Sequence, residues 1–76
     1  MEARKKKEML RKFGQKLSEH RTKKGLSFRE LASRCDVDAS DIQKYETGQV
    51  NPTLSTISDL AIGLGIAPKE LLEFDF

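Results

Sequence analysis

The chain has 76 residues, 37% hydrophobic and 34% charged, with a formal net charge of +2, which suits one domain near the lower size limit for a self-sufficient core. One cysteine excludes an internal disulfide, and one cysteine with one histidine supplies too few ligands for a zinc site unless acidic residues or a second chain add ligands. No apolar run resembles a signal peptide or a membrane span, so we expect a soluble cytoplasmic protein.

The first predicted helix follows a polar leader at residues 1–7, which we expect to be frayed or helical only when supported. From residue 8 onward, apolar residues recur at helical spacing. They are Leu10, Phe13 and Leu17. Gly14 within this helix is unfavourable by about 1 kcal/mol and therefore predicts the close approach of another helix. Lysines followed by a glycine predict the helix end at residues 22–25.

Residues 26–52 contain two short helical patterns joined by a tight turn. Ser27 and Glu30 predict a capping box at the start of the first helix, and Asp38 is expected to cap the second. The predicted inward residues are Leu31, Ala32 and Cys35, then Ile42 and Tyr45. Gly48 is expected to end the second helix. Two short helices on a turn of three to four residues predict a helix-turn-helix.

Two more helices are predicted after this motif. Thr53 is the expected N-cap of the fourth helix, and Gly65 is its expected end. The residues that this helix is expected to bury are Leu54, Ile57, Leu60, Ala61 and Leu64. Pro68 favours the start of a short fifth helix. Its apolar residues are Leu71, Leu72, Phe74 and Phe76, which either close the core or form the contact of a homodimer.

In this order and spacing, the residues resemble the Cro/lambda-repressor-like, or XRE, family of helix-turn-helix domains. The similarity covers about Phe13 to Leu72. The residues that carry it are Phe13-Gly14, Leu17, Arg21, Gly25-Leu26-Ser27, Leu31-Ala32, Val37, Ile42, Tyr45-Glu46-Thr47-Gly48, Asn51-Pro52, Leu60-Ala61 and Leu64-Gly65-Ile66. The resemblance implies an all-α, five-helix bacterial domain at residues 13–76, preceded by a basic leader at 1–12 that continues into helix one. It also implies a buried ion pair between Arg21 and Glu46.

The resemblance further implies that the helix after Asp38 enters the major groove of double-stranded DNA. Its candidate base-contacting residues are Ala39, Ser40, Asp41, Gln43 and Lys44. Phosphate contacts are expected from the leader, from the start of the first motif helix and from the loop after the second. These candidates are Arg4, Lys5, Lys6, Lys7, Arg11, Lys12, Phe28, Arg29, Thr47, Gln49 and Asn51.

The chain departs from the family pattern at several of these positions. Phe28 stands where glutamine is favoured, while Gln49 and Val50 stand where Lys or Arg is common. Asp38 and Asp41 suit a helix N-terminus. Phosphate repels them, unless Asp41 accepts a hydrogen bond from a cytosine amino group.

The distribution of charge along the chain shows where positive charge could compensate for the acidic residues of the motif. Residues 1–24 carry ten Lys and Arg against three Glu, a net charge of +7. Residues 25–50 carry three against five, or −2, and residues 51–76 carry one against four, or −3. A charge run is commonly a solvated helical face, but beside a helix-turn-helix it favours a nucleic-acid surface. We therefore hypothesise that the basic leader compensates for the acidic motif.

Two functions follow from these observations. The first is a sequence-specific transcriptional regulator, expected to be a repressor that occupies an operator. The alternative is a protein-interaction module on the same scaffold, antitoxin-like or accessory, which the acidic middle favours and the basic leader disfavours. We expect no enzyme, because the sequence offers no nucleophile–base or carboxylate pair at a plausible spacing and the core leaves no room for a substrate pocket. No cofactor, metal or membrane partner is expected.

Overall fold

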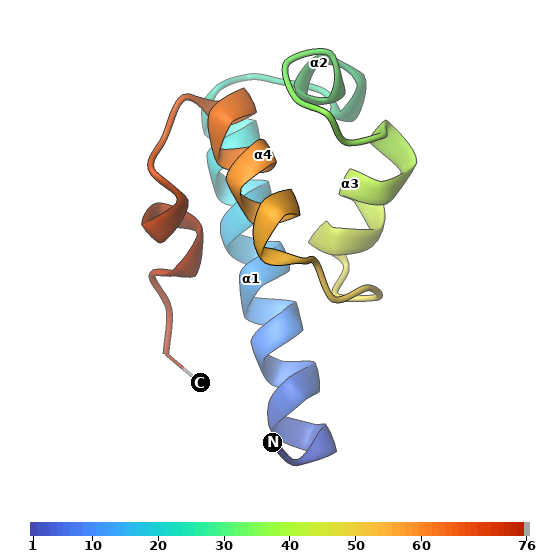
Figure 1. The fold of residues 1–76 in the computed structure, drawn as a ribbon, viewed down its shortest axis with the longest axis vertical. Coiled ribbons are helices and arrows are strands. Elements are labelled where there is room, and N and C mark those ends of the chain that lie inside the picture. The colour runs from blue at the N-terminus through green and yellow to red at the C-terminus, as the bar shows by residue number, and fades with distance from the viewer. Residues whose placement is uncertain (76) are drawn as a thin grey trace.

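The computed structural model describes residues 1–75, so the predicted terminal apolar residue Phe76 lies outside the described residues. Within this range all regular secondary structure is helical. The elements are α1 (Ala3–Lys23), α2 (Phe28–Ala32), α3 (Ala39–Glu46), α4 (Leu54–Leu64) and the 3₁₀-helix η1 (Pro68–Leu72). The fifth predicted helix is therefore one short 3₁₀ segment (Figure 1). No helix in the described part is both long and apolar enough to cross a membrane.

Helix α1 is the long axis of the molecule. It contains 21 residues, about 30 Å at 1.5 Å per residue, and the molecule is 35 Å in its longest dimension. Figure 1 shows the N-terminal turns extending past the other helices. The helix begins at Ala3, so most of the expected polar leader is already part of α1, although residues 1–7 are all exposed.

Each helical element contributes to one hydrophobic core. The side chains with relative exposures of 0 or 1% are Leu17, Leu31, Ile42, Leu60, Ala61, Leu64 and Leu71. Leu54, a predicted core residue, is 73% exposed, and Leu72, predicted either to close the core or to form a dimer contact, is 46% exposed. Leu54 is the first residue of α4 and precedes the turn whose side chains face the core. Helical spacing alone therefore overestimated how far the buried stripe of α4 extends.

The helix ends follow the predicted signals in part. Ser27 Oγ accepts a hydrogen bond from the Glu30 amide at 3.0 Å, and Glu30 Oε1 accepts one from the Ser27 amide at 2.9 Å. Thr53 Oγ1 accepts from the Thr56 amide, and Gly65 adopts the left-handed conformation, with φ of 70°. Asp38 occupies the N-cap position of α3, but its side chain makes no capping hydrogen bond.

The turn of the motif is longer than predicted. Helix α2 ends at Ala32, so six residues, 33–38, connect it to α3. Cys35 therefore lies in the turn rather than on the helix, half-buried against the core. Its thiol donates a hydrogen bond to the Leu31 carbonyl oxygen at 3.3 Å, and burial raises the pKa of this thiol. The backbone still turns after Ala32, since the Arg34 and Cys35 amides donate to carbonyl oxygens three residues earlier. Cys35 therefore keeps a helix-like spacing in the sequence although it lies outside α2.

Candidate nucleic-acid interface

Helix α3 is held against α1 by a close backbone contact at Gly14. A Cβ atom at this position would lie 2.4 Å from the carbonyl oxygen of Glu46 and 2.6 Å from that of Tyr45. Only glycine allows this approach. The close approach of another helix was predicted from this glycine, because glycine is unfavourable within a helix. The contact fixes the C-terminal end of α3 relative to α1.

The predicted partners Arg21 and Glu46 form a two-pronged ion pair beside this contact. Arg21 Nε donates to Glu46 Oε2 at 2.6 Å, and Nη2 donates to Oε1 at 3.0 Å. The two side chains are only 13% and 7% exposed. Hydrogen bonding to Glu46 raises the pKa of Arg21 above its usual value, so this guanidinium stays charged. The pair therefore reinforces the placement of α3.

The same guanidinium also connects α1 to the start of α2. Its Nη1 donates to the Leu26 carbonyl oxygen at 2.8 Å, and its carbon atom lies 4.1 Å from the centroid of the Phe28 ring. This is a cation–π contact. Phe28, a predicted phosphate-contacting position, is therefore a half-buried packing residue beneath Arg21. The sequence did not predict this stacking.

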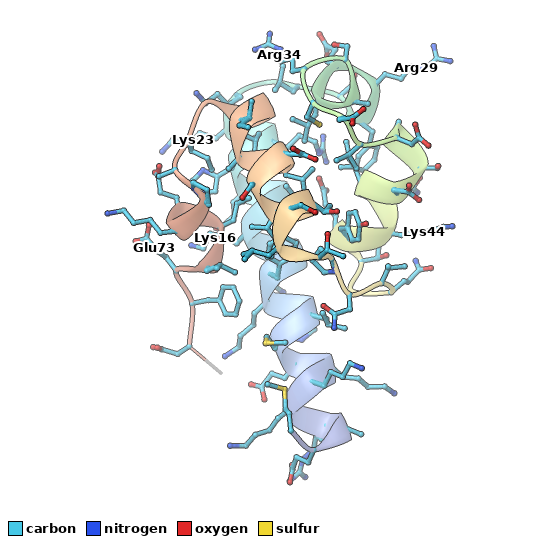
Figure 2. All side chains as sticks on the ribbon, in the orientation of Figure 1. Lys16, Lys23, Arg29, Arg34, Lys44 and Glu73 are labelled. Atoms are coloured by element: carbon cyan, nitrogen blue, oxygen red, sulfur yellow. The ribbon has the colours of Figure 1, made fainter. Side chains whose placement is uncertain are left out.

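Three of the five predicted base-contacting residues share the outward face of α3. Ser40, Gln43 and Lys44 are exposed, while Ile42 on the opposite face is completely buried. The side chains of these three residues have no hydrogen-bond or ion-pair partner among residues 1–75. Figure 2 shows Lys44 and Arg29 projecting from the same side of the molecule. Ala39 is half-buried at the first turn of the helix.

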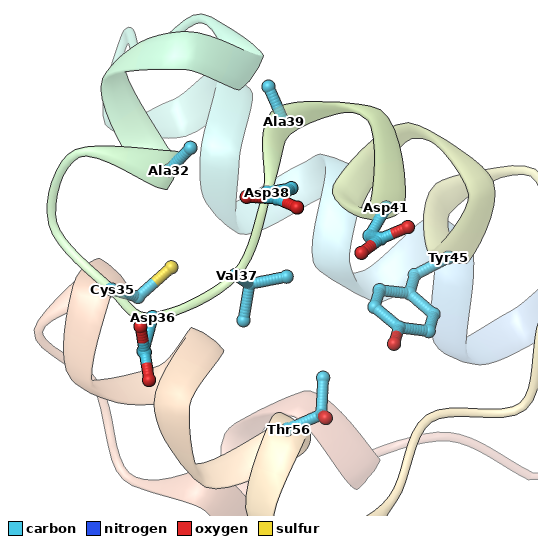
Figure 3. A pocket seen from close by; sticks show the side chains of 9 residues that line it. All are labelled: Ala32, Cys35, Asp36, Val37, Asp38, Ala39, Asp41, Tyr45 and Thr56. Carbon is cyan, nitrogen blue, oxygen red and sulfur yellow. The ribbon is translucent and has the colours of Figure 1, made fainter.

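Asp41 lies on a different face of α3 from these three residues. It is half-buried and lines a surface pocket of about 590 Å³ between the motif and α4. Figure 3 shows Asp41 and Tyr45 on the α3 side of this pocket and Thr56 on the α4 side. Asp36 and Asp38 also line it. This pocket lies on the surface and does not test the expectation that the core leaves no room for a substrate.

This pocket has no arrangement that would hold a metal ion. Within the described chain, no group of three or more His, Cys, Asp or Glu side chains is placed for metal coordination. The aspartates that line the pocket form an acidic surface on the Tyr45 side of α3, and not on the side of Ser40 and Lys44.

The loop after α3 forms its own hydrogen-bond network. Thr47 Oγ1 donates to the backbone carbonyls of Gln43 or Lys44, at 3.2 and 3.1 Å. Gln49 Nε2 donates to Thr47 Oγ1 at 2.7 Å. Both side chains are exposed, as is Asn51. The network orders the loop at the edge of the outward face of α3.

The basic residues of α1 point in different directions. Lys12 is held on the C-terminal side of the molecule, since its amine donates to the Asp75 carbonyl oxygen and lies 3.4 Å from a Glu8 carboxylate oxygen. Arg11 lies on the α3 side, because a Cβ atom on Gly48 would be 3.3 Å from the Arg11 Cα atom. The other predicted phosphate contacts of the leader are all exposed: Arg4, Lys5, Lys6 and Lys7.

Comparison with known proteins agrees with this geometry. A family model described as a helix-turn-helix domain matches residues 12–74. The chain belongs to the helix-turn-helix family. Its relatives are XRE-type regulators of the lambda-repressor-like fold, so the resemblance found in the sequence is confirmed.

Three relatives illustrate the range of similarity within the helix-turn-helix family. The control protein C.BamHI of Bacillus amyloliquefaciens is 38% identical over 63 residues, covering 82% of this chain and 78% of the relative. The crystal structure of the restriction-modification controller protein C.AhdI from Aeromonas hydrophila superposes with a TM-score of 0.79 at 48% identity, covering 82% and 94%. The regulator DdrOP3 of Deinococcus deserti is 32% identical over 62 residues, 82% of this chain but only 48% of that longer protein.

Proposed function

We propose that this chain is a sequence-specific DNA-binding transcriptional regulator that inserts α3 into the major groove. The observation that carries the proposal is the contrast between the two sides of α3. Its inner side is held by Gly14 and by the Arg21–Glu46 ion pair, whereas Ser40, Gln43 and Lys44 face outward. A rigidly placed helix with free polar side chains suits the major groove, where lysine and glutamine recognise guanine and adenine edges.

The named relatives support this class of function. They are helix-turn-helix regulators and controller proteins, and DNA-binding transcription regulation is the function that they share. We further propose that the chain is a control protein of the restriction-modification type, because C.BamHI and C.AhdI are similar over most of their own length. We also propose that it acts in the cytoplasm, as a repressor at its operator and without enzymatic activity.

Phosphate contacts are proposed from three places around α3. Arg29 at the start of α2 is exposed, without an ion-pair partner among the described residues, and projects on the side of Lys44 (Figure 2). The loop after α3 offers Thr47, Gln49 and Asn51. The basic turns of α1 offer the remaining contacts. Such contacts supply affinity and register rather than sequence preference.

A homodimer through the C-terminal apolar residues is the proposed assembly. Leu72 is 46% exposed beside an apolar groove of about 100 Å³ that is also lined by Met9, Phe13, Ile57 and Phe74. If two copies bind, the operator is a near-palindrome whose half-site centres are about one helical turn apart.

Selecting bound duplexes from a random library tests the proposed function. We expect one enriched motif, with a symmetric arrangement if the protein binds as a dimer. For a control protein, the motif should occur upstream of restriction and modification genes in its own genome. Recovery of unselected sequence, with no salt-dependent binding to any duplex, would contradict DNA binding.

The acidic pocket favours one alternative function. Asp36, Asp38 and Asp41 lie around it and suit a protein partner better than a polyanion. On this alternative the scaffold is an interaction module without base contacts. The same selection experiment separates the two functions, since an interaction module enriches no motif.

A further inference from the structure

Three of the exposed basic residues of α1 lie on one face. Arg4, Lys7 and Arg11 are spaced by three and then four residues, and such residues are neighbours on a helix surface. We name these three residues the α1 stripe. Lys5 lies at a different angle around the helix, and Lys12 points to the C-terminal segment.

The α1 stripe is in line with the contact between α1 and α3. Gly14, three residues after Arg11, receives the end of α3. The loop after α3 also touches α1 at Arg11, where a Cβ atom on Gly48 would be 3.3 Å from the Arg11 Cα and amide nitrogen atoms. The stripe therefore begins beside the loop that borders the outward face of α3 and continues along the protruding turns of α1 (Figure 1).

Helix stability does not explain the α1 stripe. The first turn of α1 contains no acidic residue, and its N-cap, Glu2, makes no side-chain capping hydrogen bond. Positive charge is unfavourable at the positive end of the helix dipole. Lys7 and Arg11 have no ion-pair partner among residues 1–75, and the Arg4–Glu2 pair is loose, at 3.7 Å with an Arg4 side chain that is 90% exposed. These charges are therefore available to an external anion.

We propose that the α1 stripe binds consecutive phosphates of one DNA strand beside the groove that α3 occupies. This inference rests on the proposed function. Arg4 and Arg11 are about 10 Å apart along the helix axis, so their long side chains can reach different phosphates of the same strand. The family match begins at residue 12, so the α1 stripe lies in a segment outside that match.

The test compares two triple variants of the full chain by titrating a random-sequence duplex at several salt concentrations. One variant is Arg4→Gln, Lys7→Gln and Arg11→Gln. The matched control is Lys23→Gln, Lys24→Gln and Lys69→Gln, which removes the same charge from exposed positions away from the N-terminal turns of α1. A third variant, Arg4→Lys with Arg11→Lys, keeps the charge of the stripe.

We expect the stripe variant to bind every duplex more weakly, with the slope of log affinity against log salt reduced by up to about 2.7, or 0.9 per phosphate contact. The control should keep a slope close to that of the wild-type protein, and the lysine variant should retain binding. Equal losses in the stripe variant and the control, or no loss in either, would overturn the proposal. If the wild-type protein binds no duplex, the proposed function itself fails, which is a different outcome. Circular dichroism confirms that each variant is folded.

Discussion

The carbonyl oxygen of Glu46 lies only 2.4 Å from the position that a Cβ atom of residue 14 would take. The carboxylate of Glu46 binds Arg21, two helical turns further along α1. Glu46 thus holds α1 through both its backbone and its side chain. This double attachment sets the angle at which α3 presents Ser40, Gln43 and Lys44 to a partner.

Replacing Gly14 with alanine should destabilise the fold, although alanine is the better helix former by about 1 kcal/mol. The added methyl group overlaps backbone atoms of Tyr45 and Glu46, which cannot rotate away as a side chain can. Overpacking of this kind costs about 1–3 kcal/mol or more. Thermal unfolding of Gly14→Ala measures the loss. Gln15→Ala at the next, exposed position is the control, and equal melting temperatures for the two variants would refute the steric account.

Arg21→Met alone should lower the free energy of unfolding by about 3–5 kcal/mol, because it leaves the Glu46 carboxylate buried without its partner. The double variant Arg21→Met with Glu46→Met should be considerably more stable than the single variant. Urea denaturation of both variants measures the difference. A single variant that melts within a degree or two of the wild-type protein would show that the ion pair is unimportant for stability.

Asp41→Asn should tighten binding to all duplexes without changing the preferred sequence. The carboxylate faces the pocket beside Tyr45 rather than the outward face of α3 (Figure 3), so it repels phosphate at a distance and contacts no base. Glu73→Gln, a charge change on the other side of the molecule from Lys44 (Figure 2), is the control. Blurring of one motif position in Asp41→Asn would instead place this side chain at a base.

The capping box predicts a pH dependence of stability. Hydrogen bonds from the Ser27 amide and then from its hydroxyl lower the pKa of Glu30 below its usual value. Since the folded pKa is lower than the unfolded one, the contribution of Glu30 is fully present above the unfolded pKa and is lost as pH falls through the folded pKa. The stability of wild type should therefore fall more steeply in this acidic range than that of Glu30→Gln. Parallel profiles from neutral pH down to about pH 3 would contradict this.

Local chemistry made much of this fold predictable. The Ser27–Glu30 box, the Thr53 cap and the glycine at position 65 each depend on residues close in the sequence, and all three occur as expected. Gly14 was informative for the opposite reason. A residue that is unfavourable in a helix indicated a tertiary contact that the local sequence did not itself contain.

Features that depend on three-dimensional placement were not predictable from the sequence. The spacing of Leu54 fits the stripe of α4, but its side chain lies at the first turn and is 73% exposed. Asp41 follows Ser40 directly, yet one residue step turns a helical side chain by about 100°, and this carries Asp41 to the pocket. Phe28 stacks under Arg21, a partner seven residues away in the sequence.

The most direct test of the account is the base preference of the triple variant Ser40→Ala, Gln43→Ala and Lys44→Ala on the selected operator. We expect the folded variant to retain salt-dependent binding to random duplex but to lose discrimination at the contacted base pairs, by about 1–3 kcal/mol for Lys44 alone at a guanine. Adding Asp41→Asn to these three changes should not reduce the base preference further, because the Asp41 carboxylate contacts no base. Unchanged affinity and unchanged preference in this quadruple variant would contradict the assignment of α3 as the DNA-contacting helix.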